Sequence, residues 1–466
     1  MKRTEHVYLM IDDSIIEDRN NLRLELGPVE KSPENPLFGA DFSSDPPRKW
    51  EPRYDNLYPS VIYDDKEAIY KIWYNGFIRE EASEKTPLHM RPDTEYFRGY
   101  REDGLMYAYS RDGLEWTKPN LDLRHFDGTT HNNIVMDVNS HGIHGVGVFK
   151  DAKESDDGRR YKALLLDAEN KKMAVAFSED GLQWSPPIHW PEHDEIGDAH
   201  PNAIRSADGY IGFMRGNKGE GINRVVMRTT SDDFIHWSKP TMVLEGANLH
   251  DQIYSMPVFH HRGIYLGFPA IFHGGDAGAA DWDLVDTELA TSSDSITWTR
   301  VAPGEPFIPR GSGSYPKGAY DCGCVYSGVP LLVGDTHRIY YGGSNGPHSG
   351  FREGFLCLAT LPKDRFAGLT VENHRVKGTV VTGTIELNGS SITVNTEIVG
   401  SLRGGIMSPS GKFIQGFAME DCVALRNGGL SVSLEWKRSI EEIRGRKTRL
   451  VFELQDATIY GFSCVG

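Results

Sequence analysis

The chain has 466 residues, of which 50 are glycine and 11% are aromatic, and its formal net charge is −16. This length exceeds one ordinary hydrophobic core, and abundant glycine with abundant aromatics is typical of short strands joined by tight turns. The negative charge argues against nucleic acid or an anionic membrane surface as a partner, since both are bound through basic residues, and is compatible with a neutral sugar.

The N-terminal part predicts no targeting or membrane segment. The apolar run at residues 7–11 is too short for the core of an export signal, and no stretch approaches a transmembrane length. The five cysteines lack paired CxxC spacing, so they predict neither a disulfide framework nor a zinc site. We expect a cytoplasmic protein with reduced thiols, unless an export signal has been trimmed.

Residues 1–52, with acidic clusters and a proline-rich stretch at 32–36, predict an irregular lead-in packed along the next domain.

One short pattern recurs four times, with serine and tryptophan six residues apart. The copies are SRDGLEW at 110–116, SEDGLQW at 178–184, SDDFIHW at 231–237 and SSDSITW at 292–298, and a degenerate copy at 360–366 ends in phenylalanine. The aromatic positions are 68, 53, 61 and 68 residues apart, which fits one four-stranded blade per interval. In each copy Ser and Asp bond the turn backbone, and the Trp begins the outer strand and packs between blades. We predict a five-bladed β-propeller over residues 53–370.

Beyond residue 370 the turn motif stops. Segments such as 391–395 and 430–436 alternate apolar and polar residues, so one face is buried and the other is in water. This is a β-sandwich signature. We therefore predict an all-β chain in which residues 371–466 form a C-terminal β-sandwich.

The predicted site lies where the innermost strand of each blade begins, because those strands point into the axial funnel. Four of the five positions carry an aspartate and the second carries a histidine pair: Asp55, His141 with His144, Asp198, Asp251 and Asp321. One such Asp is more often a turn cap, but recurrence favours a shared acidic site. Mutual repulsion raises the pKa of at least one carboxyl, leaving a proton donor beside an ionised acceptor, as glycoside hydrolysis requires. We predict the four aspartates to be catalytic.

The same openings carry side chains suited to a sugar. Tyrosines could stack on sugar faces or pack between blades, and the cations could bind hydroxyls or form structural ion pairs. The predicted substrate-binding residues are Tyr54, His144, His200, Arg215, Tyr254, Lys317, His348 and Glu353. The last two belong to a glycine-rich segment that lacks the phosphate-loop pattern. We predict no cofactor and assign no metal, although oxygen ligands and His144 could hold a structural divalent cation on the axis.

Through these turns, with YKAL at 161–164, YLGF at 265–268 and YYGG at 340–343, residues 50–370 resemble the five-bladed propeller glycosidases of glycoside hydrolase families 32, 43, 62 and 68. The likeness is greatest to proteins similar to the family 32 N-terminal domain, and the C-terminal part resembles the sandwich appended to family 32 enzymes. The resemblance implies an Asp nucleophile or base, which Asp55 matches, a second Asp as stabiliser and a Glu acid. The family's Asn-Asp-Pro-Asn, Arg-Asp-Pro and Glu-Cys signatures are missing, so the acid would be Asp198, Asp251 or Asp321, with Glu353 an outside candidate.

We therefore predict a glycoside hydrolase, exo-acting on a fructosyl or arabinosyl furanoside or a related oligosaccharide. One alternative is a glycoside phosphorylase or transferase, for which Arg215, Lys317, His348 and Arg352 are the only hints of a phosphate pocket. The other is a non-catalytic carbohydrate-binding propeller whose aspartates cap turns or bind a structural cation.

Overall fold

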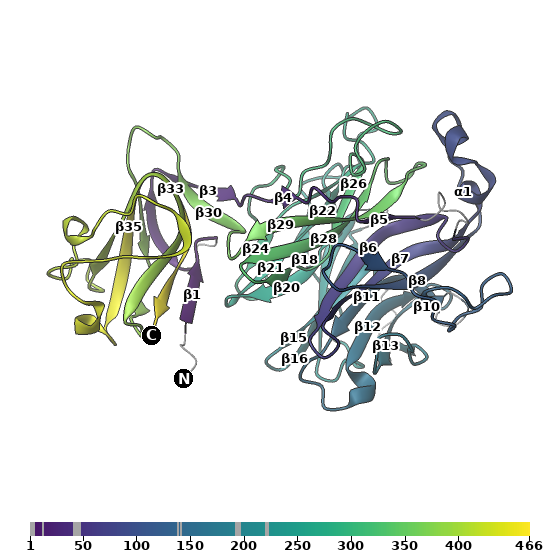
Figure 1. Cartoon of the computed structure of the whole chain (residues 1–466), viewed down its shortest axis with the longest axis horizontal. Coiled ribbons are helices and arrows are strands. Elements are labelled where there is room, and N and C mark those ends of the chain that lie inside the picture. Colours follow the sequence, from purple (N-terminus) through teal and green to yellow (C-terminus); the bar gives the residue numbers. More distant parts are fainter. Residues whose placement is uncertain are drawn as a thin grey trace.

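The computed structural model describes residues 5–11, 14–40, 48–137, 139, 142–191, 197–219 and 223–466, apart from the side chains of Glu5, Asp55 and Ala199. Within these residues the chain is all-β, with one short α-helix, α1 (Glu81–Lys85). Figure 1 shows a large propeller-like array of sheets beside a smaller unit, at which both chain ends lie. No helix in the described part of the chain is long and apolar enough to cross a membrane.

Four sheets of four or five strands follow one another along the chain. The first contains β6 (Arg53–Asp64), β7 (Ile69–Glu80), β8 (Arg101–Ser110), β9 (Trp116–Thr117) and β10 (Ile134–Asp137). The second contains β11 (Ile143–Lys150), β12 (Tyr161–Asp167), β13 (Lys172–Ser178) and β14 (Ile188–His189), and the third β15 (Asp198–Ser206), β16 (Gly209–Asn217), β17 (Arg224–Ser231) and β18 (Thr241–Glu245). The fourth contains β20 (Val258–His261), β21 (Ile264–Gly267), β24 (Ala290–Ser292) and β25 (Thr299–Arg300). The pairing within each is antiparallel, as in propeller blades, so the all-β, propeller-like prediction is confirmed.

The remaining strands of the array share one nine-stranded sheet. It contains β26 (Cys324–Ser327), β27 (Leu331–Val333), β28 (Thr336–Ser344) and β29 (Gly354–Pro362), with β4 (Glu30–Lys31) and β5 (Phe38–Gly39) added at β29. A parallel bridge between Val285 and Cys324 joins β19 (Gln252–Ser255), β22 (Ala270–Phe272) and β23 (Val285–Thr287) to the same sheet. The fourth and fifth predicted blades thus share a sheet, and the count of five stays a prediction.

The repeated motif forms the predicted turn in all four full copies. In the first, Ser110 Oγ accepts the Gly113 N–H at 2.8 Å, and Asp112 Oδ1 accepts those of Leu114 and Glu115 at 2.8 and 2.9 Å. The fourth residue is left-handed, with φ of +78° at Gly113, and the equivalent Phe234 and Ser295 take the same conformation because the turn caps hold it. In the degenerate copy Asp364 bonds His261 and Arg262 instead.

The motif's aromatic residues pack between sheets, as predicted. Trp184 belongs to a buried cluster with residues of the first and second sheets, and Trp237 and Trp298 belong to the next two clusters. Trp116 contacts Tyr340 of β28 edge to face, with ring centroids 5.7 Å apart. Since Tyr340 belongs to the last sheet, this contact closes the array into a ring.

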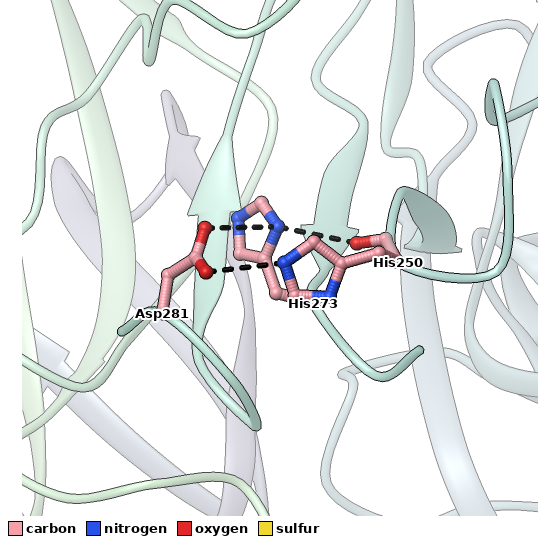
Figure 2. A group of neighbouring side chains, drawn as sticks. All are labelled: His250, His273 and Asp281. Carbon is pink, nitrogen blue, oxygen red and sulfur yellow. Dashed lines mark hydrogen bonds and ion pairs between the residues drawn. The ribbon is translucent and has the colours of Figure 1, made fainter. Parts of the chain in front are cut away.

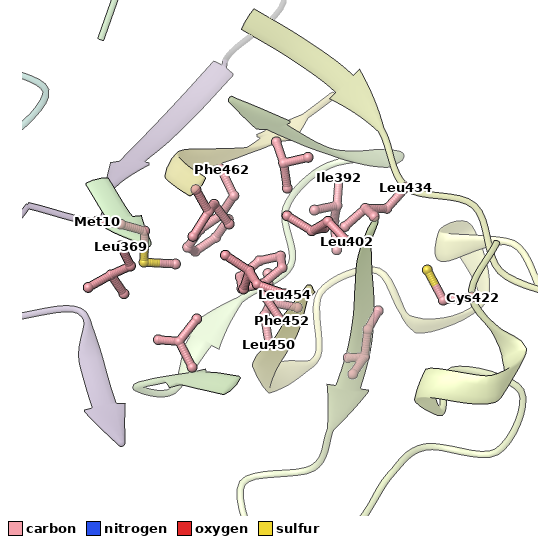
Figure 3. Packing of buried hydrophobic residues seen from close by; sticks show 14 of the residues in the cluster. Met10, Leu369, Ile392, Leu402, Cys422, Leu434, Leu450, Phe452, Leu454 and Phe462 are labelled. Atoms are coloured by element: carbon pink, nitrogen blue, oxygen red, sulfur yellow. The ribbon is translucent and has the colours of Figure 1, made fainter. Parts of the chain in front are cut away.

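The smaller unit is one nine-stranded sheet that joins both ends of the chain. It contains β1 (Glu5–Leu9), β2 (Ile16–Asn20), β3 (Leu22–Leu26), β30 (Ala367–Val371), β31 (Gly378–Thr382), β32 (Ile385–Glu386), β33 (Ser391–Met407), β34 (Gly429–Ser433) and β35 (Lys447–Val465). Its core packs Met10 and Leu369 with Phe452 and Phe462 (Figure 3). The prediction of an irregular lead-in is therefore wrong for residues 5–26, whose alternating leucines turn inward in β3. The strands β4 and β5 lie on the propeller-like array, and Leu9 and Ile11 are buried against it. The sandwich and the boundaries at 52 and 370 stay predictions.

The turn aspartates make stability depend on pH. Backbone N–H bonds from Thr297 and then Ile296 lower the pKa of Asp294 to about 2. The folded carboxyl therefore binds protons less readily than the unfolded one, so its stabilisation is complete above about pH 4 and is lost as the pH falls through about 2. We expect Asp294→Asn to lower the urea midpoint at pH 7 and the gap to wild type to close near pH 2. Glu305→Gln, at an exposed carboxylate, is the control, and a gap that persists at low pH would contradict the assignment.

Candidate functional site

A cavity of about 820 Å³ lies where all five predicted blades meet. Its lining residues are Arg53, Phe77, Tyr96, Arg98, Gly99, Arg101 and Asp103 from the first sheet and its β7–β8 connection, His144, Leu166 and Ala168 from the second sheet and the residue after β12, Asp198, Arg215 and Arg224 from the third, Tyr254 from β19, and His348, Ser349 and Arg352 from the β28–β29 loop. Because every sector of the ring contributes, the cavity lies on the axis of the array.

The cavity is basic, which corrects the expectation of an acidic axial site. Six of its lining residues are arginines, whereas Asp103 and Asp198 are the only acidic residues of the described lining. The whole chain carries a charge of −16, so positive charge is concentrated here against the overall balance. Binding a neutral sugar does not require six positively charged side chains, whereas an anionic group forms strong charge-assisted hydrogen bonds with them.

Two of the arginines keep buried N–H groups that make no hydrogen bond in the described structure, although Arg53 Nη1 lies 3.6 Å from Oε1 of the buried Glu80 carboxylate. The Nε and Nη1 groups of Arg53 and of Arg215 make no hydrogen bond there. Burial, followed by the neighbouring charge of Arg352, lowers the pKa of Arg53 to about 10, so it is still cationic at neutral pH. Buried donors are almost always paired in folded proteins, and buried like charges repel. This group of side chains therefore fits an oxyanion that accepts several N–H bonds.

Tyr254 supports two of the guanidinium groups. The carbons at the centres of the Arg215 and Arg224 guanidinium groups lie 4.6 and 5.0 Å from its ring centroid. The ring of His348 meets it edge to face at 4.8 Å. Tyr254 is thus a platform for cations, and the predicted role of stacking on a sugar gains no support from its contacts.

A histidine links the two carboxylates of the cavity. Nδ1 of His144 lies 3.1 Å from Asp103 Oδ1, and its Nε2 lies 3.1 Å from Asp198 Oδ1. The second oxygen of Asp198 is bonded to Arg215. His144 thus bridges two carboxylates, of which Asp198 is also paired with a guanidinium group. This is an acid–base group at the wall of a cavity.

His348 is a neutral donor or acceptor. Burial, then the charges of Arg352, Arg224 and the other cavity arginines, hold its pKa well below the usual value. Its Nδ1 lies 2.9 Å from the hydroxyl oxygen of Tyr326, which fixes the ring. The adjoining Ser349 donates from its backbone N–H to buried Asp283 at 2.7 Å, so the loop itself is held in place.

Five of the predicted site residues line the cavity: His144, Asp198, Arg215, Tyr254 and His348. The side chain of Asp55, like the whole of His141, lies outside the described residues. Asp251 and Asp321 do not line the cavity. Arg300 binds Asp251 at 2.6 Å, and Lys31 binds Asp321 at 2.5 Å, so each carboxylate is neutralised by a cation distant in sequence.

The other four predicted binding residues also lie outside the lining. Tyr54 is buried and bonds Gly39 and Glu51, and His200 stacks on Tyr58 with its pKa lowered to about 3 by burial. Lys317 is exposed on the loop before β26, and Glu353 bonds Asn345 at 3.0 Å. Tyr54 and His200 are core residues of the inner strands. Near the axis, the first residues of an inner strand can pack against neighbouring strands instead of facing the cavity.

The sequence reasoning missed Asp103 and most of the arginines. Asp103 and Arg101 lie at the start of β8, and Arg224 lies at the start of β17, the third strand of its sheet. In an antiparallel meander the first and third strands start at the same end, so these positions face the same funnel as the starts of the innermost strands. The charged residues at the start of each third strand are therefore the sequence signal for Arg101, Asp103 and Arg224.

No protein-family model matches the chain, and no curated protein matches it. Among solved structures it is similar to β-1,2-mannobiose phosphorylase from Listeria innocua, with 12% identity over 72% of this chain and 96% of that chain and a TM-score of 0.47. It is similar to a glycosyl hydrolase from Bacteroides ovatus, with 14% identity over 72% of this chain and 94% of that chain and a TM-score of 0.47. It is also similar to an N-acetylgalactosamine deacetylase from F. plautii, with 16% identity over 74% of this chain and 97% of that chain and a TM-score of 0.43. With identities below 25% and TM-scores below 0.5, these likenesses carry no argument about the activity of this chain.

The arginine cavity predicts stabilisation by an oxyanion. We expect inorganic phosphate to raise the melting temperature, since a ligand present at 100 times its Kd adds about 2.7 kcal/mol to the free energy of unfolding. Arg224→Gln should weaken this effect, whereas Arg205→Gln, outside the cavity lining, should leave it unchanged. Sodium chloride at equal ionic strength controls for screening. An equal phosphate response in wild type and Arg224→Gln would argue against an anion at this place.

Proposed function

We propose that the chain is a carbohydrate-active enzyme that cleaves a glycosidic bond in the axial cavity, with phosphate as the attacking group. The observation that carries this proposal is the presence of six arginines and the Asp103–His144–Asp198 group in one cavity. The resemblance of the repeat turns to propeller glycosidases supports the carbohydrate part. The proposed scaffold is a five-bladed propeller over 53–370 with a β-sandwich over 371–466.

In the proposed reaction, Asp103 with His144 supplies the proton. The acid protonates the glycosidic oxygen, the bond from that oxygen to the anomeric carbon breaks, and a phosphate oxygen forms the new bond to that carbon. The products are a sugar phosphate and a shortened saccharide. Asp198, held by Arg215, stays ionised and stabilises positive charge on the imidazole of His144.

The arginines have two roles in this proposal. They bind the phosphate through several charge-assisted N–H bonds, which suit the oxygens of a phosphate group. They also orient it toward the anomeric carbon, so that the attack is effectively intramolecular. Neutral His348 can donate one further hydrogen bond without adding charge.

A second candidate is hydrolysis of a saccharide that carries its own anionic group. The same arginines favour it, because they would bind a sugar carboxylate or phosphate equally well. Water would then take the place of inorganic phosphate as the attacking group. The contacts of the cavity favour no particular ring form, so the predicted exo action on a furanoside stays a prediction, as does the non-catalytic binding role.

The experiment compares product release with and without inorganic phosphate on a panel of neutral and acidic oligosaccharides. We expect a sugar phosphate that forms only with phosphate present, and Asp103→Asn to lower the rate about 10²- to 10⁴-fold through loss of acid catalysis. Arg352→Gln should raise the KM for phosphate more than it lowers kcat.

Asp112→Asn, the same substitution at a turn, is the matched control and should retain the rate. Release of free sugar at a phosphate-independent rate, only from acidic substrates, would favour the hydrolase. Turnover that survives Asp103→Asn would exclude the proposed acid, and binding without turnover on any substrate would favour a carbohydrate-binding propeller.

A further inference from the structure

Two histidines and an aspartate meet beside the inner strands of the fourth predicted blade. His250 precedes β19, His273 directly follows β22, and Asp281 lies in the loop between β22 and β23. In the sheet Phe272 pairs with both Gln252 and Val285, so the chain around these three residues comes together at one strand end. Figure 2 shows both imidazole rings facing the Asp281 carboxylate.

The geometry of the group suits a single small cation. One donor atom from each residue lies within 4.8 Å of the other two. His250 Nε2 lies 3.1 Å from Asp281 Oδ1, and His273 Nδ1 lies 3.6 Å from Asp281 Oδ2. The backbone oxygen of His250 also lies 3.3 Å from His273 Nδ1. Two oxygens thus face this ring nitrogen, and a proton or a cation must lie between them.

A second carboxylate orients one of the rings. His273 Nε2 lies 2.9 Å from Asp286 Oδ2, and the other oxygen of Asp286 accepts from Arg310 Nε at 2.7 Å. When Nε2–H donates to Asp286, the lone pair of a neutral His273 is on Nδ1, which points at Asp281. Histidines that bind metals commonly have such a carboxylate behind them, which fixes the tautomer and the ring orientation.

We propose that His250, His273 and Asp281 bind one divalent metal ion of the zinc type. Imidazole nitrogens with a carboxylate oxygen are the donors that zinc and its neighbours among the transition metals prefer. The three side chains are 28%, 15% and 38% exposed, so water can complete the coordination. Binding at His250 Nε2 places the ring proton on Nδ1, and the 3.3 Å contact of that nitrogen with the Asp276 N–H is given up.

The site would fasten a loop that reaches the axial cavity. Asp283, two residues after Asp281, is buried and accepts from the backbone N–H and the hydroxyl of Ser349 at 2.7 and 3.0 Å. The backbone N–H of His348 donates to the Asp283 carbonyl at 2.7 Å. Since His348 and Ser349 line the cavity, a metal ion at this place stiffens one wall of it without touching the bound ligand.

A second His–His–Asp group in the described structure provides a contrast. His261, His337 and Asp364 also bring their donor atoms within 4.8 Å. There, however, the guanidinium of Arg262 binds Asp364 at 3.0 and 3.3 Å. Because this carboxylate is already paired with a cation, we assign no metal to the second group.

The test is a titration of the chelator-treated full chain with Co²⁺ and Zn²⁺, followed by the visible absorption of Co²⁺ and by calorimetry. We expect one equivalent for wild type, and loss of tight binding in His273→Ala and Asp281→Asn. Asp286→Asn should bind 10- to 100-fold more weakly, because it removes only the group that orients His273.

His261→Ala is the matched control, since it removes a histidine from the other group, and it should bind one equivalent as wild type does. Circular dichroism checks that each variant is folded, and His250→Asn replaces His273→Ala if that variant is not. Stoichiometry and affinity unchanged in Asp281→Asn and His250→Asn would overturn the proposal, as would a wild type that binds no ion.

Discussion

The contact between the first and the last sheets of the array is the constraint on which the rest of the structure depends. Trp116 packs on Tyr340, whose hydroxyl donates to the carbonyl of Gly113 at 2.9 Å, although more than 200 residues separate them. At the cavity end, Arg352 of the last sector donates to Asn56 of the first. Without this closure the strand starts of different blades would face different directions. With it, side chains spread over 300 residues of sequence line one cavity.

The distribution of charge is the second property that the ring makes possible. An acidic chain places six arginines around one cavity, and at Arg53 both burial and the charge of Arg352 oppose the charged form. Arg53 illustrates the cost, since its pKa falls to about 10 and two of its N–H groups lack a hydrogen bond in the described structure. Such an arrangement lowers the stability of the unliganded protein, and a bound anion would offset this cost. Low-dielectric walls also focus the positive potential, so an anion can be attracted locally despite the acidic surface.

The sequence predicted the local features well and the pairing of distant charges poorly. The Ser–Asp turns and the interblade tryptophans depend on residues within one motif, so their pattern is visible in the sequence. Asp251 and Asp198 stand at comparable positions before inner strands, yet one is paired with Arg300 and the other reaches the cavity. Only the folded arrangement decides this. The pairing of β1 with β35 is similarly invisible, because it joins residues about 450 positions apart.

The N-terminal segment contributes strands to both units. Lys31, in β4 at the edge of the last sheet of the array, binds Asp321, which is 1% exposed and also accepts from the Tyr341 hydroxyl at 2.8 Å. A buried carboxylate without such a partner would be strongly unfavourable, so the array depends on a residue from the segment that follows β3 of the smaller unit. In turn β3 pairs with β30, the strand that leaves the array. The chain thus enters and leaves the ring side by side, and the smaller unit holds both ends without contributing any described residue to the cavity lining.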